Sequence, residues 1–243
     1  MSRDAQPILA VNGLVKRFGG FHALDGLSFH VSSGEILGLV GPNGSGKTTA
    51  INVISGLYAP DGGTLTYDGA PIGGMASHKI VHRGVNRTFQ IPKPFLSLTV
   101  RQNVEVALAY GRAEVAPPKL SDLLEQYHLA DLADRPAADL NSSQQKMLDL
   151  VRALATRPRL LLPDELAAGL NPTELDWIAG HIKALAQSGL AIIVVEHLMG
   201  FIEQITDRVI VMNAGKEIFE GTLAVAVKVP QGIEVFLGGE HGA

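Results

Sequence analysis

Cysteine is absent from this chain of 243 residues, and tryptophan occurs only once. The lack of cysteine rules out disulfides and thiol chemistry, and it suits a reducing compartment. Long hydrophobic runs are missing too, since no stretch approaches the ~20 apolar residues that span a bilayer. No hydrophobic signal region follows residues 1–6. We therefore expect a cytoplasmic protein.

Positive charge is also scarce in this chain. It has 20 Lys and Arg against 24 Asp and Glu, which gives a formal net charge of −4. Proteins that bind nucleic acid usually carry a basic stripe or patch, so no nucleic-acid partner is expected. The hydrophobic content of 46%, beside 18% charged residues, is that of a globular protein with a substantial core. The length predicts one large domain, or one domain with an inserted lobe.

The most informative segment is the glycine-rich loop Gly41-Pro42-Asn43-Gly44-Ser45-Gly46-Lys47-Thr48-Thr49. It fits the phosphate-binding pattern G-x-x-x-x-G-K-[ST], in which glycines let consecutive backbone N–H groups point at phosphate oxygens. In that pattern Lys47 reaches the β- and γ-phosphates, and the Thr48 hydroxyl holds Mg²⁺. An apolar run at 36–40 precedes the loop and a helical segment at 48–55 follows it. The sequence therefore predicts a triphosphate site between a strand and a helix.

Strands and helices alternate along the rest of the chain. Apolar or alternating runs predict further strands at 8–11, 27–31, 64–67, 85–89, 160–162, 190–195, 209–212 and 216–220. The first two are separated by Gly19-Gly20 and a turn near Asp25-Gly26. Helices are predicted at 77–83, 100–109 (opened by a capping box of Thr99 and Gln102), 121–128, through 147–154, and at 173–187. This alternation implies a mostly parallel sheet covered on both faces, and the helix-rich stretch from 92 to about 159 implies an inserted helical lobe.

Two of the predicted strands end in polar side chains that could act on a phosphate group. Asp164 and Glu165 follow the run at 160–162, and His197 follows the run at 190–195. In a phosphate-loop ATPase such an aspartate takes part in holding Mg²⁺, and the adjacent glutamate can position the attacking water. His197 could contact the γ-phosphate, because open α/β sheets bind ligands at the carboxyl ends of their strands. The alternatives are a surface acidic pair and a histidine with a structural role.

Three further features have two interpretations each. Phe18 either stacks on a nucleobase or belongs to the core. His78 and His82 lie four residues apart on a predicted helix and could ligate a metal, but no third ligand is near, so a solvated helix face is favoured. The apolar segment 91–100, with Phe95 and Leu96, is either a docking surface or buried core.

Taken together, these segments resemble an ATP-binding cassette (ABC) ATPase subunit, from about residue 8 to residue 223. The resemblance implies an α/β P-loop NTPase fold with a mostly parallel sheet, an antiparallel β subdomain and an inserted α-helical lobe. Residues 1–243 would form a single ATP-binding domain, with its core at about 1–90 and 160–243 and the helical lobe at about 91–159.

The same resemblance implies roles for particular residues. Catalysis would depend on Glu165, His197, Gln90 and Lys47, with Mg²⁺ bound by Thr48, Gln90 and Asp164. ATP would be contacted by the stacking aromatic, the Walker A loop and, across a dimer, the signature segment at 140–145: Phe18, Gly41, Pro42, Asn43, Gly44, Ser45, Gly46, Lys47, Thr48, Thr49, Asn141, Ser143 and Gln144. ATP and Mg²⁺ are thus the implied cofactors.

Some segments point to a particular group of transporters. Residues 87–90, 98–100 and 167–172 resemble the ATPase subunits of branched-chain amino-acid importers, although amide and urea importers share these features and the lipopolysaccharide-export ATPase does so less closely. The implied function is ATP hydrolysis that powers an importer. The implied partners are a second ABC ATPase subunit, in a homo- or heterodimer, integral membrane permease subunits and, indirectly, a solute-binding protein. The implied location is cytoplasmic and peripheral on the inner face of the cell membrane.

Four positions depart from the pattern of this family. Asn141 stands where serine is usual and Ser143 where glycine is usual, while Pro163 and Leu166 are exchanged relative to Leu-Asp-Glu-Pro. The Cβ of Ser143 intrudes where backbone must approach phosphate, and a proline inside a central strand loses a ladder hydrogen bond. The alternative is therefore a regulatory subunit that binds ATP but hydrolyses little. A soluble ABC ATPase that acts on DNA or ribosomes is disfavoured by the acidic balance. Residues 238–241 are expected to form a floppy tail.

Overall fold

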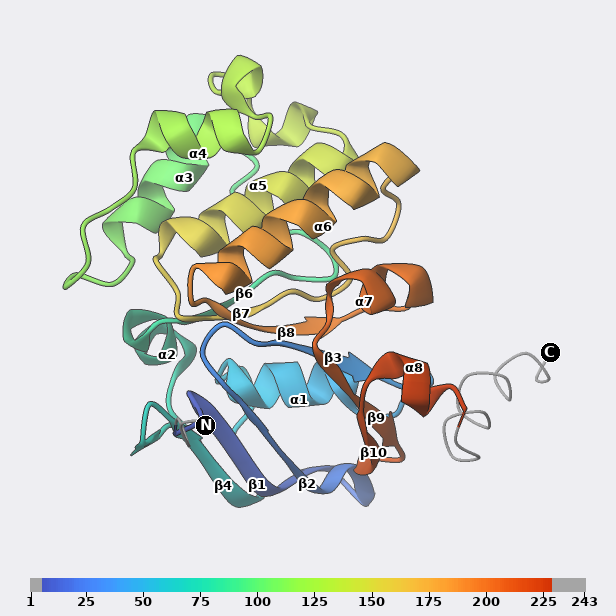
Figure 1. Ribbon diagram of the computed structural model, residues 1–243. Coiled ribbons are helices and arrows are strands. Elements are labelled where there is room, and N and C mark those ends of the chain that lie inside the picture. The colour runs from blue at the N-terminus through green and yellow to red at the C-terminus, as the bar shows by residue number, and fades with distance from the viewer. Residues whose placement is uncertain (1–5, 229–243) are drawn as a thin grey trace.

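Two β-sheets and a group of helices are stacked in layers (Figure 1). The computed structural model describes residues 6–228, so the tail expected at 238–241 lies outside the described residues. A four-stranded sheet lies at the bottom of Figure 1, and helix α1 (Lys47–Ile54) separates it from a six-stranded sheet. Helices α5 (Ser142–Ala155) and α6 (Pro172–Gln187) cover the opposite face of the six-stranded sheet. The predicted α/β class is confirmed.

The six-stranded sheet has the strand order β10-β9-β3-β8-β7-β6. All neighbouring pairs are parallel except β10 and β9. Every residue of β3, β7 and β8 is buried, as expected for strands covered on both faces. The prediction of a mostly parallel sheet is confirmed. The strands are β3 (Ile36–Val40), β6 (Val85–Arg87), β7 (Leu160–Leu162), β8 (Ala191–Val195), β9 (Arg208–Asn213) and β10 (Lys216–Gly221).

Alternate residues of this sheet pack in two different hydrophobic cores, because successive side chains of a strand point to opposite faces. Ile192 and Val194 of β8 pack in the core that contains α5 and α6. Ile193, between them, packs in the core that contains α1 and the antiparallel sheet, together with Leu37 and Leu39 of β3. Apolar burial on both faces fixes the sheet between the layers and holds the carboxyl ends of β3, β6, β7 and β8 at one edge.

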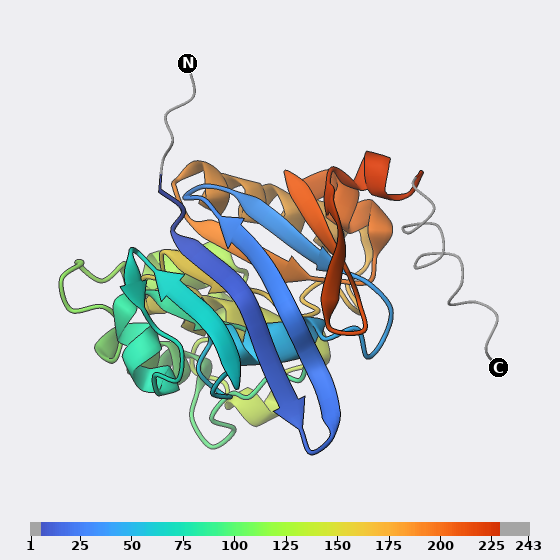
Figure 2. The ribbon, with the colours of Figure 1, turned by 90° about the horizontal axis from the view of Figure 1, so that it is seen from below.

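The four-stranded sheet is antiparallel, with the order β2-β1-β4-β5, and Figure 2 looks onto it. Its strands are β1 (Leu9–Phe18), β2 (Phe21–Val31), β4 (Gly62–Tyr67) and β5 (Ala70–Pro71). The predicted break at Gly19-Gly20 is confirmed as the β1–β2 hairpin turn, whereas the turn predicted near Asp25-Gly26 was wrong. Gly26 instead lies within β2, at a register shift, with φ of 86°. A bulge that interrupts the alternation of side chains explains why the sequence indicated shorter strands.

For each helix whose two ends were predicted, the observed ends lie within two residues of the predicted ones. These helices are α1, α2 (Ser77–Arg83), α3 (Val100–Ala109), α4 (Leu120–Gln126) and α6, and α5 contains the predicted segment 147–154. The capping box of Thr99 and Gln102 opens α3 as expected. Within residues 6–228, four short helical elements were not predicted, namely the 3₁₀ turns Ala130–Leu132 and Ala137–Asp139, α7 (Met199–Ile205) and α8 (Leu223–Ala226). The two-residue strand β5 was not predicted either. Within residues 6–228, none of the helices has the length and apolar character needed to cross a bilayer.

Candidate active site

A pocket of about 300 Å³ lies where the carboxyl ends of the parallel strands meet the glycine-rich loop. It combines residues of the β1–β2 hairpin, of the loop and first turn of α1, and of the segments after β6, β7 and β8. The structure therefore brings together most of the site residues predicted from the sequence. The lining consists of Phe18, Phe21, Ala23, Asn43, Gly44, Gly46, Lys47, Thr48, Thr49, Gln90, Glu165 and His197.

Two glycines of the loop occupy places where no side chain fits. Gly41 has φ of 149°, and a Cβ at this position would lie 2.2 Å from the carbonyl oxygen of Met212. Gly46 has φ of 105°, and a Cβ there would lie 2.5 Å from the carbonyl oxygen of Ala23. The loop thus needs glycine both for its backbone conformation and for its close approach to neighbouring strands.

Lys47 lies within the curl of this loop. Its Nζ donates hydrogen bonds to the carbonyl oxygens of Gly41 at 2.8 Å and Pro42 at 2.9 Å. Burial lowers the pKa of Lys47, while the nearby carboxylates of Glu165 and Asp164 act in the opposite direction. The pocket therefore contains one ammonium group beside the N-terminal turn of α1, a combination suited to a polyphosphate.

Three polar side chains meet in the same pocket, each from the end of a different strand. Glu165 Oε2 accepts a hydrogen bond from Gln90 Nε2 at 2.9 Å, and Glu165 Oε1 lies 3.1 Å from His197 Nε2. The backbone of Glu165 has φ of 53°, in the left-handed region that non-glycine residues rarely adopt. Its N–H donates to the carbonyl oxygen of Val195 at 2.9 Å, which fixes this conformation against β8. The carboxylate is therefore held between an amide and an imidazole.

Pro163 lies one residue beyond the end of β7, not inside the strand. The β7–β8 ladder pairs residues 160 and 161 and then continues only as a single bridge between Asp164 and Val195. The Pro163 carbonyl oxygen still accepts a hydrogen bond from the Val195 N–H at 3.0 Å. The proline therefore costs the sheet only the hydrogen bond that a backbone N–H at this position would donate. Asp164 and Glu165 consequently lie at the carboxyl end of β7, where the sequence suggested them.

Asp164 is a buried carboxylate that is only partly satisfied. Its side chain is 1% exposed, and Oδ2 lies 3.4 Å from Arg87 Nη2. Its Oδ1 has no hydrogen-bond partner among residues 6–228. Burial raises the pKa of Asp164, and the positive charges of Arg87 and Lys47 oppose this effect. A buried carboxylate oxygen without a protein partner suits a bound cation.

The side chains predicted to bind a metal, those of Thr48, Gln90 and Asp164, offer oxygen atoms of the kind that fits Mg²⁺. Carboxylate, hydroxyl and amide oxygens are hard ligands, and Mg²⁺ is usually bound by one or two protein groups together with substrate phosphates and water. Among residues 6–228, no group of three or more His, Cys, Asp or Glu side chains is arranged to hold a metal by itself. His78 and His82 are both exposed, in agreement with the favoured solvated helix face.

Phe18 is not a core residue, since it is 44% exposed at the end of β1. Its ring packs edge-on against Tyr58 with centroids 5.3 Å apart, and it lines the pocket. Phe21, which is 61% exposed, lines the same pocket and was missed in the sequence. The signal that would have found it is the tight hairpin, because Phe18 and Phe21 are paired across the turn. The pocket thus has an aromatic end suited to a flat ring.

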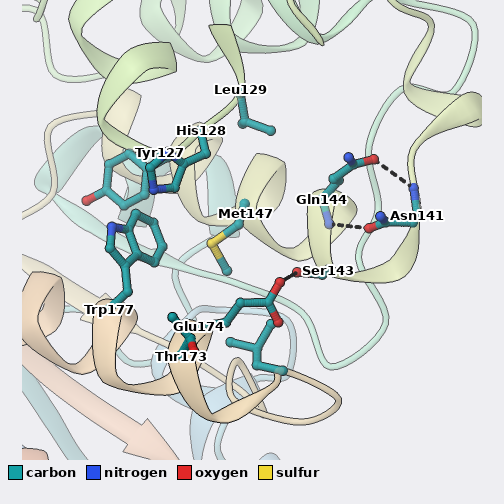
Figure 3. A pocket seen from close by; sticks show the side chains of 11 residues that line it. Tyr127, His128, Leu129, Asn141, Ser143, Gln144, Met147, Thr173, Glu174 and Trp177 are labelled. Atoms are coloured by element: carbon teal, nitrogen blue, oxygen red, sulfur yellow. Dashed lines mark hydrogen bonds between the residues drawn. The ribbon is translucent and has the colours of Figure 1, made fainter. Parts of the chain in front are cut away.

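The signature residues lie in a different place. Asn141, Ser143 and Gln144 line a second pocket, of about 350 Å³, together with residues 127–129, which follow α4, and residues of α5 and α6 (Figure 3). Asn141 and Gln144 form a capping box at the start of α5, each side chain accepting from the backbone N–H of the other. The Ser143 hydroxyl points toward Glu174 and donates to its Oε1 at 3.3 Å. One chain therefore does not bring these three residues to the glycine-rich loop.

The fold and the first pocket together define a phosphate-loop nucleotide hydrolase of the α/β class, and known proteins resemble it closely. The family model described as ABC transporter matches residues 24–168. The high-affinity branched-chain amino acid transport ATP-binding protein BraF of Pseudomonas aeruginosa is 36% identical over 252 residues, covering 96% of this chain and 99% of BraF. Its counterpart LivG of Escherichia coli is 34% identical, with the same two coverages.

Solved structures agree with these sequence relatives. A nucleotide-free ATP-binding cassette from an ABC transporter matches with a TM-score of 0.84 at 31% identity, covering 95% of this chain and 99% of that one. The ADP conformation of such a cassette matches with a TM-score of 0.83, also at 31% identity, covering 96% of this chain and 99% of that one. The chain belongs to the ABC transporter family, and it is an ATP-hydrolysing cassette.

Proposed function

We propose that this protein hydrolyses ATP to drive an importer of branched-chain amino acids or related solutes. The solute class rests on BraF and LivG, which are named for branched-chain amino acid transport and match nearly the whole chain. The catalytic part rests on one observation, namely that Gln90, Glu165 and His197 meet in the pocket that also contains Lys47.

In the proposed site, Phe18 stacks on the adenine and the glycine-rich loop binds the phosphates through its N–H groups and Lys47. Thr48, Gln90 and Asp164 would hold Mg²⁺, which would supply positive charge near the phosphate oxygens. Glu165 positions and polarises the attacking water, and its hydrogen bonds to Gln90 and His197 keep the carboxylate oriented. Phosphoryl transfer needs little covalent help, so positioning and fixed charges supply most of the catalysis.

The signature residues would act on the nucleotide of a second subunit, either a copy of this chain or a related one. Their distance from the chain's own phosphate loop supports this assignment, because Asn141, Ser143 and Gln144 line a separate pocket. Ser143 presents a side chain where the family has glycine, and it is tied to Glu174. In the assembled transporter, Ser143→Gly should raise the rate of ATP hydrolysis. An unchanged rate would remove the argument that this segment is weakened.

Permease subunits would dock near the segment that follows Gln90. Ile91, Phe95 and Leu96 are 76%, 46% and 54% exposed, whereas Val100 is buried, so the segment is mostly surface and only its end is core. Beside it lies a groove of about 190 Å³ that includes Phe95 and Tyr110. Docking there would place the protein on the inner face of the cell membrane, with a solute-binding protein as an indirect partner.

Reconstitution tests the proposed function. The full chain is co-purified with the permease subunits encoded beside it, placed in liposomes with their solute-binding protein, and assayed for ATP hydrolysis with leucine, urea or acetamide. We expect leucine to stimulate hydrolysis and uptake, and Lys47→Ala to abolish both, while the control Lys183→Ala, at an exposed position of α6, keeps them. Stimulation by urea or acetamide but not by leucine would refute the solute class. A wild-type protein without hydrolysis would refute the catalytic assignment.

A further inference from the structure

Lys146 is a buried lysine that the proposed reaction does not use. It lies in the second turn of α5, where its side chain is part of the protein interior at 9% exposure. Its Nζ donates hydrogen bonds to the carbonyl oxygen of Glu165 at 2.7 Å and to that of Ala168 at 2.6 Å. Burying an ammonium group is costly unless it gains strong partners, so a lysine here needs a reason. Burial lowers the pKa of Lys146, and the carboxylates of Glu196 and Glu165 oppose that effect.

The segment that Lys146 holds begins with the residue proposed to position the attacking water. Glu165 has the left-handed φ of 53°, a conformation that costs a non-glycine residue free energy and persists only where the surroundings enforce it. Its N–H donates to Val195 and its carbonyl oxygen accepts from Lys146, so both peptide groups that flank its Cα are fixed. These two contacts set the direction in which the side chain leaves the backbone.

A buried carboxyl group holds the same segment from the end of β8. Glu196 follows β8 directly and is 2% exposed, and its Oε1 accepts the N–H of Ala167 at 2.8 Å. Residues 165–168 are therefore held through their carbonyl oxygens by α5 and through an N–H by the end of β8. The carboxylate of Glu165 is the only charged group of this segment, and it points toward Gln90 and His197, to which it is hydrogen-bonded.

We propose that Lys146 is a positioning residue for ATP hydrolysis. Its ammonium group fixes the peptide carbonyl of Glu165 and thereby keeps the Glu165 carboxylate aimed into the nucleotide pocket. This inference rests on the proposed role of Glu165. Lys146 does not line that pocket, so its effect reaches the reaction only through the backbone of Glu165.

The test compares substitutions at Lys146 in the full chain. Lys146→Met keeps the length of the side chain and removes both hydrogen bonds, whereas Lys146→Arg keeps a positive donor. Lys183→Met, at an exposed position of α6, is the matched control. Each variant is assayed for kcat and KM of MgATP hydrolysis, for nucleotide affinity by calorimetry, and for its unfolding midpoint, with kinetics at a temperature where every variant is folded.

We expect Lys146→Met to lower kcat at least tenfold while KM and nucleotide affinity change less than threefold, because Lys47 and the loop are untouched. Lys146→Arg should recover most of the lost rate, and Lys183→Met should match the wild type. Three results would overturn the proposal: a kcat within twofold of wild type for Lys146→Met, a matching loss of nucleotide affinity, or an arginine variant as slow as the methionine variant.

A double-variant cycle separates this inference from the proposed function. If Lys146 acts through Glu165, then Lys146→Met should cause no further loss in a Glu165→Gln protein, measured with radiolabelled ATP over hours. A further tenfold loss in that background would show that Lys146 acts elsewhere. A Glu165→Gln protein that hydrolyses ATP at the wild-type rate would instead refute the proposed role of Glu165. Loss of activity in Glu165→Gln without any loss in Lys146→Met would refute only the present inference.

Discussion

The buried carboxyl group of Glu196 should make the stability of this protein depend on pH near neutrality. Burial raises the pKa of Glu196 from 4.5 to about 7, against the smaller lowering effects of the Ala167 N–H and the Lys146 charge. A carboxyl group with a raised pKa holds its proton more tightly in the folded chain than in the unfolded chain. The free energy of unfolding therefore falls as the pH rises from about 4.5 to about 7.

Glu196→Gln removes this charge but keeps a carbonyl oxygen that can accept the Ala167 N–H, which lies 2.8 Å from Glu196 Oε1. One pH unit of difference between folded and unfolded pKa corresponds to about 1.4 kcal/mol. Relative to low pH, the raised pKa therefore lowers the free energy of unfolding by about 3 kcal/mol at pH 8 and by about 1 kcal/mol at pH 5. The free energy of unfolding of the variant, relative to that of the wild type, should therefore increase by about 2 kcal/mol from pH 5 to pH 8. For a chain of this size, this corresponds to about 4–8 °C in the unfolding midpoint.

The assay is thermal unfolding followed by circular dichroism at pH 5, 6, 7 and 8, at constant ionic strength and without nucleotide. Glu203→Gln serves as the control, because it makes the same chemical change at an exposed position of α7. The difference in unfolding midpoint between Glu196→Gln and the wild type should widen from pH 5 to pH 7 and change little from pH 7 to pH 8, while the difference for Glu203→Gln should not widen. If the unfolding midpoint of Glu196→Gln differs from that of the wild type by the same amount at all four pH values, the reasoning is refuted.

Three further predictions concern the pockets. Glu165→Gln should lower kcat by ~100-fold or more without weakening nucleotide binding, because a water-positioning base is lost. Steady-state kinetics measure this effect, and a near-normal kcat would contradict the role assigned to Glu165. Gly46→Ala should weaken MgATP binding in calorimetry by more than tenfold, because its Cβ would meet the Ala23 carbonyl oxygen at 2.5 Å; unchanged affinity would show that the loop adapts. Tyr127→Phe should raise the free energy of unfolding, measured in urea, by about 1 kcal/mol. The reason is that the buried Tyr127 hydroxyl has no hydrogen-bond partner within residues 6–228. No gain in stability would mean that this hydroxyl is hydrogen-bonded in solution.

The parts of the site that sequence reasoning found are those encoded by local patterns. The loop 41–49 is recognisable because its backbone geometry demands particular residues at fixed spacing. Glu165 and His197 were found because polar residues directly after buried parallel strands must lie at one edge of the sheet. Local helix signals, such as the capping box at Thr99, succeeded for the same reason, since cap and partner lie three residues apart.

The parts that were missed depend on contacts between distant segments. Lys146 looks like any residue of an amphipathic helix, and only the folded chain brings it to carbonyl oxygens 19 and 22 positions away. Phe21 faces the pocket because of the register of a hairpin, and the lengths of β1 and β2 were underestimated because glycine bulges hide the alternation. Helix α7 has only seven residues and no side-chain cap, so its local signal is weak.

The distance between the phosphate loop and the signature segment has a genetic consequence. If nucleotides are sandwiched between two copies of this chain, an allele damaged at Lys47 and an allele damaged at Asn141 should complement each other. A mixed pair would concentrate both lesions in one sandwich and leave the other intact, whereas a pair of identical mutant chains would have a lesion in each. Transport restored by co-expressing two inactive alleles would thus follow from one geometric fact, that each chain carries the two halves of its chemistry in separate places.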